Sequence, residues 1–164
     1  MAKFGKCDYK LLKELQKKVD RLKGDDFNAF CESCAKKLAA RLLRLVIDRT
    51  LPGQYPPGSG KVGGTLRRGW TSKTEAEARG GGGPDAEVYA NSLPITKVGD
   101  TYQIEIINPV HYASYVEFGH MTRNHENWVK GRFMLTYSER ELQSQAPGIL
   151  ERKLKKYLEE CFND

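Results

Sequence analysis

The sequence predicts an α+β fold in which an antiparallel β-sheet of about three to four strands packs with N-terminal and C-terminal helices, joined by long Gly/Pro-rich loops. Apolar residues recur at helical spacing near both ends of the chain and alternate with polar residues in the middle. With 164 residues, 39% of them hydrophobic and 29% charged, the chain suits one globular domain. We therefore expect a single domain over 1–164, with a helical part at 1–50, loops and sheet at 51–110, and a short helix, loop and C-terminal helices at 111–164.

Two amphipathic helices are predicted in the first fifty residues. The first covers residues 8–23, where leucine and valine residues recur at spacings of three and four between lysines. The second runs from Asp25, whose carboxylate suits a helix N-terminus, to about Thr50. The Pro52-Gly53 pair then ends the helical pattern, and the glycines and prolines of residues 51–64 exclude regular structure.

Strands are expected between residues 86 and 108. Residues 87–90 begin this region, Gly99-Asp100 marks a turn, and residues 101–107 alternate apolar and polar side chains. A glycine run at residues 80–83, followed by proline, precedes it as a mobile loop tip. We expect an antiparallel hairpin or a larger sheet with one face covered by helices.

The last third of the chain is expected to be mostly helical. Residues 111–119 read as a short helical turn ended by a glycine, and residues 120–130 as a polar loop that carries Trp128. Residues 132–161 have a helical pattern, but Pro147 removes a backbone donor and restricts the residue before it. A break or kink is therefore expected near Ala146.

The sequence offers little support for catalysis. Cys31 and Cys34 have the C-x-x-C spacing of redox and zinc sites, but both fall on the apolar face of a predicted helix and lack the further ligands of a structural zinc site. His120, Asn124 and His125 lie close together without a set of acidic partners that could complete a metal site. We predict a protein that is not an enzyme and has no catalytic residue, cofactor or metal site, with thiols that stay reduced.

A net charge of +6 and a pI near 9.1 favour contact with polyanions in a general way. A basic segment with an aromatic residue, Trp70, lies beside the flexible loops and forms a candidate DNA-facing patch. The alternative is an exposed polar edge with Trp70 packed into the core. The patch consists of Lys61, Arg67, Arg68 and Lys73.

Three segments, in this order and spacing, resemble a known family. Residues 64–70 read Gly-Thr-Leu-Arg-Arg-Gly-Trp, residues 108–120 read Asn-Pro-Val-His-Tyr-Ala-Ser-Tyr-Val-Glu-Phe-Gly-His, and residues 131–135 read Gly-Arg-Phe-Met-Leu at the opening of a long helix. Together they resemble the tail-completion or head–tail joining (neck) proteins of long-tailed bacteriophages and prophages. The sequence departs from the family pattern at Gly69, where a serine is common, and in a longer segment after Gly119.

The resemblance implies a non-catalytic structural protein of the virion neck, a tail-completion or head–tail connector subunit in a homo-oligomeric ring at the top of the tail, with six-fold symmetry expected. It implies contacts with tail terminator, tail tube or head-side connector proteins, and a channel through which DNA passes without sequence-specific binding. A ring subunit needs complementary patches on different faces. The candidate interface residues are Tyr112, Tyr115, Glu117, Phe118 and Trp128.

The expected location is the virion, at the neck or tail top, after assembly in the host cytoplasm, because the N-terminus shows no apolar signal segment and no stretch suits a membrane. The alternative function is a nucleic-acid-binding phage accessory protein, which rests on the positive charge and the arginine–tryptophan segment. Packing in the core is an equally open explanation for the three aromatic residues between 112 and 118.

Overall fold

The computed structural model describes residue 13 and residues 16–20, 24–61, 63–81 and 83–163. The helix predicted over residues 8–23 therefore lies mainly outside the described residues, although residues 16–20 are helical.

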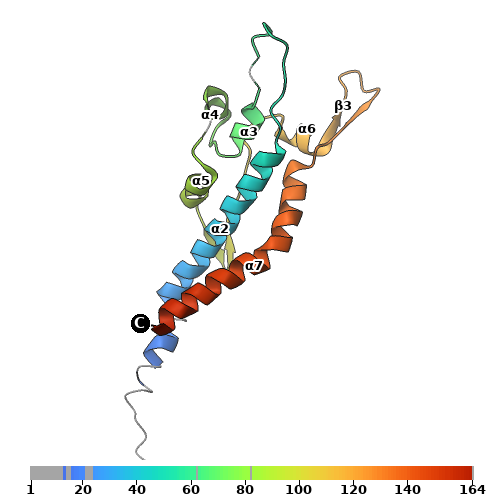
Figure 1. Cartoon of the computed structure of the whole chain (residues 1–164). Coiled ribbons are helices and arrows are strands. Elements are labelled where there is room, and N and C mark those ends of the chain that lie inside the picture. The colour runs from blue at the N-terminus through green and yellow to red at the C-terminus, as the bar shows by residue number, and fades with distance from the viewer. Residues whose placement is uncertain (1–12, 14–15, 21–23, 62, 82, 164) are drawn as a thin grey trace, which may run out of the picture.

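A long pair of antiparallel helices forms the axis of the molecule (Figure 1). Helix α2 (Asp25–Arg49) confirms the second predicted helix, and helix α7 (Met134–Asn163) runs back along it. Arg49 of α2 pairs with Glu141 of α7 at 2.6 Å, near the end where α7 begins. At the opposite end the rings of Phe30 and Tyr157 stack with centroids 4.4 Å apart. The two helices are thus joined by polar and aromatic contacts along most of their length.

Helix α7 is continuous but bent. Pro147 lies inside it, and Figure 1 shows its first part running in a different direction from its last part. A proline inside a helix cannot donate to the residue four positions earlier, and its ring crowds the preceding turn. The predicted kink is therefore confirmed, whereas a complete break does not occur.

Helix α5 (Ala86–Ser92) packs against α2 and forms the core with it. The strand predicted at residues 87–90 is wrong, because this segment is helical. The Asp85 carboxylate accepts from the Glu87 backbone N–H at 2.8 Å and caps the helix, which places small and aromatic residues at helical spacing toward α2. The buried core residues are Ala39, Ala40, Leu43, Val46, Trp70, Ala86, Tyr89, Ala90 and Met134.

Two short helices follow the end of α2. Helix α3 (Thr65–Gly69) carries the chain back to the core, and helix α4 (Glu75–Gly80) begins at a capping box formed by Thr74 and Glu77. Trp70 directly after α3 is buried, and its indole Nε1 donates to Thr50 Oγ1 at 2.8 Å. This bond joins the segment after α3 to the C-terminal end of α2.

The described strands form two separate two-stranded antiparallel sheets, one of β1 (Thr96–Val98) with β2 (Thr101–Gln103) and one of β3 (Gly119–Met121) with β4 (Trp128–Lys130). The predicted α+β class is confirmed, and so is the turn at Gly99-Asp100. The strands do not join into one sheet, and the polar loop predicted at residues 120–130 is instead the second hairpin.

The alternation predicted for residues 101–107 is present in burial but not in strand pairing. The strand ends at Gln103, yet Ile104 and Ile106 pack against the core while Glu105 and Ile107 are exposed. Side chains of an extended chain point alternately to opposite sides whether or not a partner strand is present. The apolar–polar alternation therefore predicted which side chains point inward, but not whether the backbone pairs with another strand.

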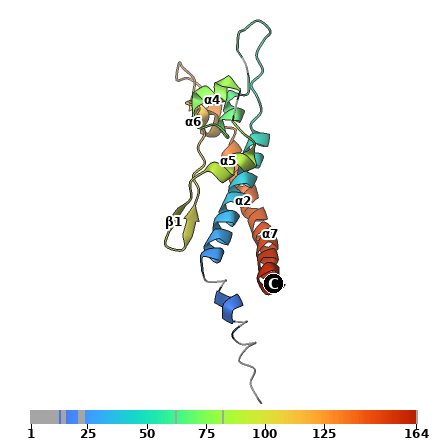
Figure 2. The same cartoon turned by 90° about the vertical axis from the view of Figure 1, so that its left-hand side faces the viewer.

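Two projections extend from the same end of the helix pair (Figure 1). They are the loop that follows α2, whose residues 51–61 are all exposed, and the β3–β4 hairpin, which follows helix α6 (Ala113–Phe118). The β1–β2 hairpin lies beside α2 instead (Figure 2). None of the helices among the described residues combines the length and apolarity that a membrane span requires.

Candidate assembly surface

The segment from Asn108 to Gly119 is held in place by its first residue. Asn108 Nδ2 donates to the Leu66 carbonyl at 2.8 Å, and its Oδ1 accepts from the Val110 backbone N–H at 3.2 Å. A Cβ on Gly69 would lie 2.3 Å from Asn108 Oδ1. Gly69 therefore gives the Asn108 side chain room to connect α3 with the segment before α6.

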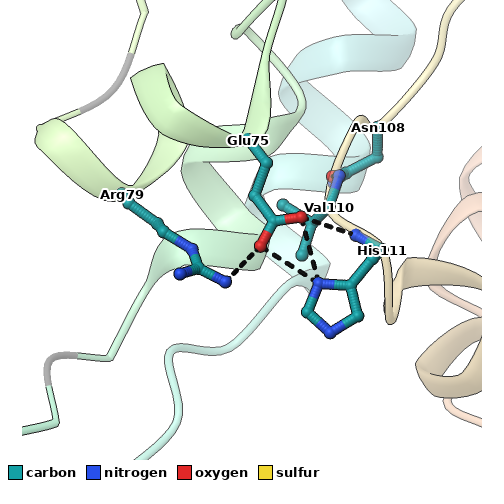
Figure 3. Close-up of polar contacts among 5 residues, drawn as sticks. All are labelled: Glu75, Arg79, Asn108, Val110 and His111. Atoms are coloured by element: carbon teal, nitrogen blue, oxygen red, sulfur yellow. Dashed lines mark hydrogen bonds and ion pairs between the residues drawn. The ribbon is translucent and has the colours of Figure 1, made fainter.

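The Glu75 carboxylate of α4 binds His111 of the same segment (Figure 3). Glu75 accepts from the His111 backbone N–H at 3.1 Å, both its oxygens lie 3.0 Å from His111 Nδ1, and Arg79 donates to it from one turn further along α4. These hydrogen bonds, led by that of the His111 ring, lower the pKa of Glu75 to about 2. The charged Glu75 carboxylate thus connects α4 to the segment directly before α6.

Glu117 connects α6 to the beginning of α7. Its side chain is buried, and its oxygens accept from the backbone N–H groups of Leu135 and Thr136 at 3.0 and 2.9 Å and from the Thr136 hydroxyl at 2.9 Å. These N–H groups belong to the first turn of α7, which has no partners for them within the helix. Glu117 therefore caps α7 from outside, with its negative charge at the positive end of the helix.

Two glycines allow the hairpin to leave this junction. Gly119 has φ +92°, and a Cβ on it would lie 2.5 Å from the Val129 carbonyl oxygen and 2.9 Å from the Trp128 ring. A Cβ on Gly131 would lie 2.3 Å from the Glu117 carbonyl oxygen. Gly119 therefore lets the two strands approach each other closely, and Gly131 lets the chain after β4 lie against the end of α6, so the base of the hairpin is fixed in place.

One face of the hairpin borders a groove of about 280 Å³. Its other walls come from the loop after α2, from α3 and from α6. Of the residues that the structure describes, three tyrosines and three cations line it, and no carboxylate does. We call it the tyrosine groove, after Tyr55, Tyr112 and Tyr115, and its cations are Arg67, Lys130 and Arg132.

The other face of the hairpin and the end of α6 expose large apolar side chains. Phe118 is 61% exposed and Trp128 is 60% exposed, and Trp128 lies opposite Met121 in the β3–β4 register. Tyr115 is also 56% exposed, but it lines the tyrosine groove and lies edge-on to the His120 ring, with centroids 5.9 Å apart. Exposed apolar side chains on a braced element are typical of a protein–protein contact. We call Phe118, Met121 and Trp128 the hairpin surface.

The structure separates the five predicted interface residues into three groups. Phe118 and Trp128 belong to the exposed hairpin surface, and Tyr112 and Tyr115 line the tyrosine groove, where Tyr112 is partly buried and Tyr115 is exposed. Glu117 faces inward, where it caps α7. Sequence reasoning missed the groove and the hairpin, although Gly119 and Gly131, which flank residues 120–130, are the signal of closely approaching strands.

The predicted basic patch is not one surface. Arg68 is partly buried, where its Nε donates to the Ala78 carbonyl at 2.8 Å and its Nη1 to the Gly63 carbonyl at 3.3 Å. Lys61 lies over the Tyr55 ring at 5.8 Å, Arg67 lines the tyrosine groove, and Lys73 lines a different depression beside α5. Trp70 is buried, in agreement with the alternative of an aromatic residue packed into the core.

The cysteines of the described residues lie between α2 and α7 as free thiols. Cys34 and Cys161 are buried, Cys31 is partly buried, and burial raises the pKa of Cys34. Within the described ranges, no three histidine, cysteine or acidic side chains gather in a way that could hold a metal ion.

A family model matches residues 13–119, which is more than half of the 164-residue chain. Its description is "Bacteriophage HK97-gp10, putative tail-component". The chain belongs to this HK97-gp10-like family. This phage tail component is thus a protein of the virion, and the family resemblance read from the sequence is confirmed. The match ends at Gly119, the first residue of β3, so the rest of the β3–β4 hairpin and α7 follow the matched segment. Neither the curated proteins nor the solved structures contain a match.

Proposed function

We propose that this tail component is a neck subunit, a tail-completion or head–tail connector protein that forms a closed ring, six-fold in symmetry, at the top of the tail. The observation that carries the proposal is the exposed hairpin surface on a braced base. Phe118 and Trp128 are each more than half exposed, whereas the backbone that bears them is fixed by the Glu117 cap and by Gly119 and Gly131.

A closed ring requires two different surfaces on each subunit, because every copy contacts one neighbour with one face and the next neighbour with another. The hairpin supplies one apolar face through Met121 and Trp128 and borders the tyrosine groove with the face of His120 and Val129. These two surfaces, which belong to one hairpin, support an assembly with heterologous contacts. The protein acts by this assembly and not by catalysis.

The partners proposed beyond the ring are the tail terminator, the tail tube or a head-side connector protein. The loop after α2 and the hairpin project from the same end of the molecule (Figure 1), and so can reach a neighbouring ring together. The exposed side chains of Tyr55 in the loop and of Met121 and Trp128 in the hairpin strands are suited to burial against such a partner.

The test is complementation of a phage or prophage from which this gene alone is deleted. The double variant Phe118→Ser/Trp128→Ser is expected to leave separate DNA-filled heads and unattached or malformed tails in electron micrographs of lysates. Which part is malformed assigns the subunit to the head side or the tail side. The matched control is Val88→Ser/Val98→Ser, which removes two exposed apolar side chains from α5 and β1. Intact infectious particles from the hairpin variant would overturn the proposal.

A further inference from the structure

A second groove lies between α2 and α7, alongside the bend of α7, and it has a different chemistry from the tyrosine groove. It has a volume of about 690 Å³, and six of its lining residues are cations. Among the described residues, no carboxylate and no aromatic side chain lines it. We call it the cationic groove. Its cations are Lys37, Arg41 and Arg44 of α2 and Arg152, Lys153 and Lys156 of α7.

The spacing of these cations aligns them along the two helices. Lys37, Arg41 and Arg44 follow one another at four and three residues, which places them on one face of α2 over about 10 Å at a rise of about 1.5 Å per residue. Arg152 and Lys156 are similarly four residues apart on α7. The groove therefore has a row of positive charge on each side.

The cations are only partly neutralised by the protein itself. Glu87 pairs with Arg44 at 2.5 Å and Lys37 at 3.7 Å, and Glu160 pairs with Lys156 at 3.7 Å. The neighbouring Glu141 is already paired with Arg49 at 2.6 Å. Among the described residues, Arg41 donates to Gln145 and Lys153 to Ser33, both uncharged, although Glu141 also attracts Arg41. An excess of positive charge therefore faces the groove.

The composition of the groove favours phosphate over protein. Protein–protein interfaces are enriched in aromatic residues and depleted of lysine, whereas protein–DNA interfaces are polar and strongly positive. The planar guanidinium groups of Arg41, Arg44 and Arg152 are suited to paired hydrogen bonds with phosphate oxygens. We infer that the cationic groove binds the phosphate backbone of double-stranded DNA, without reading its sequence. This binding is a property of the single chain and does not depend on the proposed ring.

The experiment measures binding of the full chain to a labelled duplex of arbitrary sequence over a series of salt concentrations. The triple variant Lys37→Gln/Arg152→Gln/Lys156→Gln removes three exposed groove cations. We expect its affinity at low salt to fall about ten- to hundredfold, and the slope of log K against log salt to decrease by up to about 2.7, since each lost phosphate contact contributes about 0.9.

The matched control is Lys17→Gln/Arg123→Gln/Arg140→Gln, which removes the same net charge from exposed cations outside both grooves. It is expected to retain the affinity and the salt slope of the unchanged protein. An equal loss in both triple variants would show attraction by net charge alone and would overturn the inference. An unchanged affinity in the groove variant would also overturn it. Binding of polyglutamate in the groove without binding of the duplex would do the same. Circular dichroism of both variants verifies that they are folded.

Discussion

At the scale of single residues, Glu75 shows how one carboxylate can set a pH dependence. Its pKa of about 2 in the folded protein lies below its ordinary value of 4.5. A group with a lowered pKa stabilises the folded state fully above the ordinary pKa and loses this contribution as the pH falls toward the folded one. We expect thermal stability to fall between about pH 4.5 and pH 2 as Glu75 becomes protonated and its bond to His111 weakens.

The variant Glu75→Gln isolates this contribution. It is expected to unfold at a lower temperature than the unchanged protein at neutral pH, with the difference disappearing near pH 2, as measured by circular dichroism. Glu105→Gln, at an exposed position, is the control. A difference that stays constant from neutral pH to pH 2 would mean that the Glu75 charge does not stabilise the α4–α6 contact.

Arg67, Arg68 and Trp70 are close in sequence, but their different surroundings in the fold could not be predicted from the sequence. The sequence presents them as one basic, aromatic-containing segment, yet Arg67 is exposed, Arg68 binds two backbone carbonyls and Trp70 is buried. The carbonyls of Gly63 and Ala78 reach Arg68 only after the loop and α4 have folded around it. The cationic groove could not be predicted from residue spacing along one helix either, because its cations come from both α2 and α7.

At the scale of elements, Glu117 is the link between α6 and α7. The variant Glu117→Ala leaves two backbone N–H groups of α7 and the Thr136 hydroxyl without their acceptor. Loss of a helix cap costs about 1 kcal/mol, and a buried donor without a partner costs about 1–3 kcal/mol. We expect the free energy of unfolding in urea to fall by about 2–4 kcal/mol. Glu117→Gln, which keeps one acceptor oxygen, should lose less, and equal stability of all three proteins would contradict the capping role.

The elements that were predicted correctly are determined by residues that are neighbours in the sequence. The helix over residues 25–49 and the turn at Gly99-Asp100 have strong local signals and were predicted correctly. Residues 87–90 were read as a strand, although Asp85 as a cap and the helical spacing of Ala86, Tyr89 and Ala90 indicated a helix. The β3–β4 hairpin was missed because polar residues dominate it and its support comes from α6, which is a tertiary contact.

At the scale of the whole molecule, the buried core and the surfaces that we propose for assembly lie on different parts of the chain. The buried residues lie mainly on α2, α5 and the start of α7, whereas the loop after α2 and the β3–β4 hairpin expose most of their side chains. Both projections lie at the end where α7 begins (Figure 1), while the cationic groove lies further along the helix pair. Contacts between subunits and contact with DNA can therefore occur on separate parts of one molecule.

This division predicts the effect of replacing residues 55–61 by a Gly-Ser linker of equal length. All seven residues are exposed, and the hydrogen bonds of Ser59 and the contact of Lys61 with Tyr55 lie within the replaced segment. Substitutions at such positions usually change the free energy of unfolding by less than about 0.5 kcal/mol. The variant should therefore unfold in urea like the unchanged protein, but it should fail to restore infectious particles to the deletion phage, because the tyrosine groove has lost Tyr55.

A second replacement at an exposed site away from the groove tests whether the position of the linker, and not its flexibility, causes the effect. Residues 123–126, at the exposed tip of the β3–β4 hairpin, can be replaced by Gly-Ser residues without touching the tyrosine groove. If the loop variant also loses stability, the loop belongs to the folded core and the division between stability and assembly is wrong. If it is stable and fully infectious, the groove wall formed by the loop takes no part in assembly, and the interface must be confined to the hairpin surface.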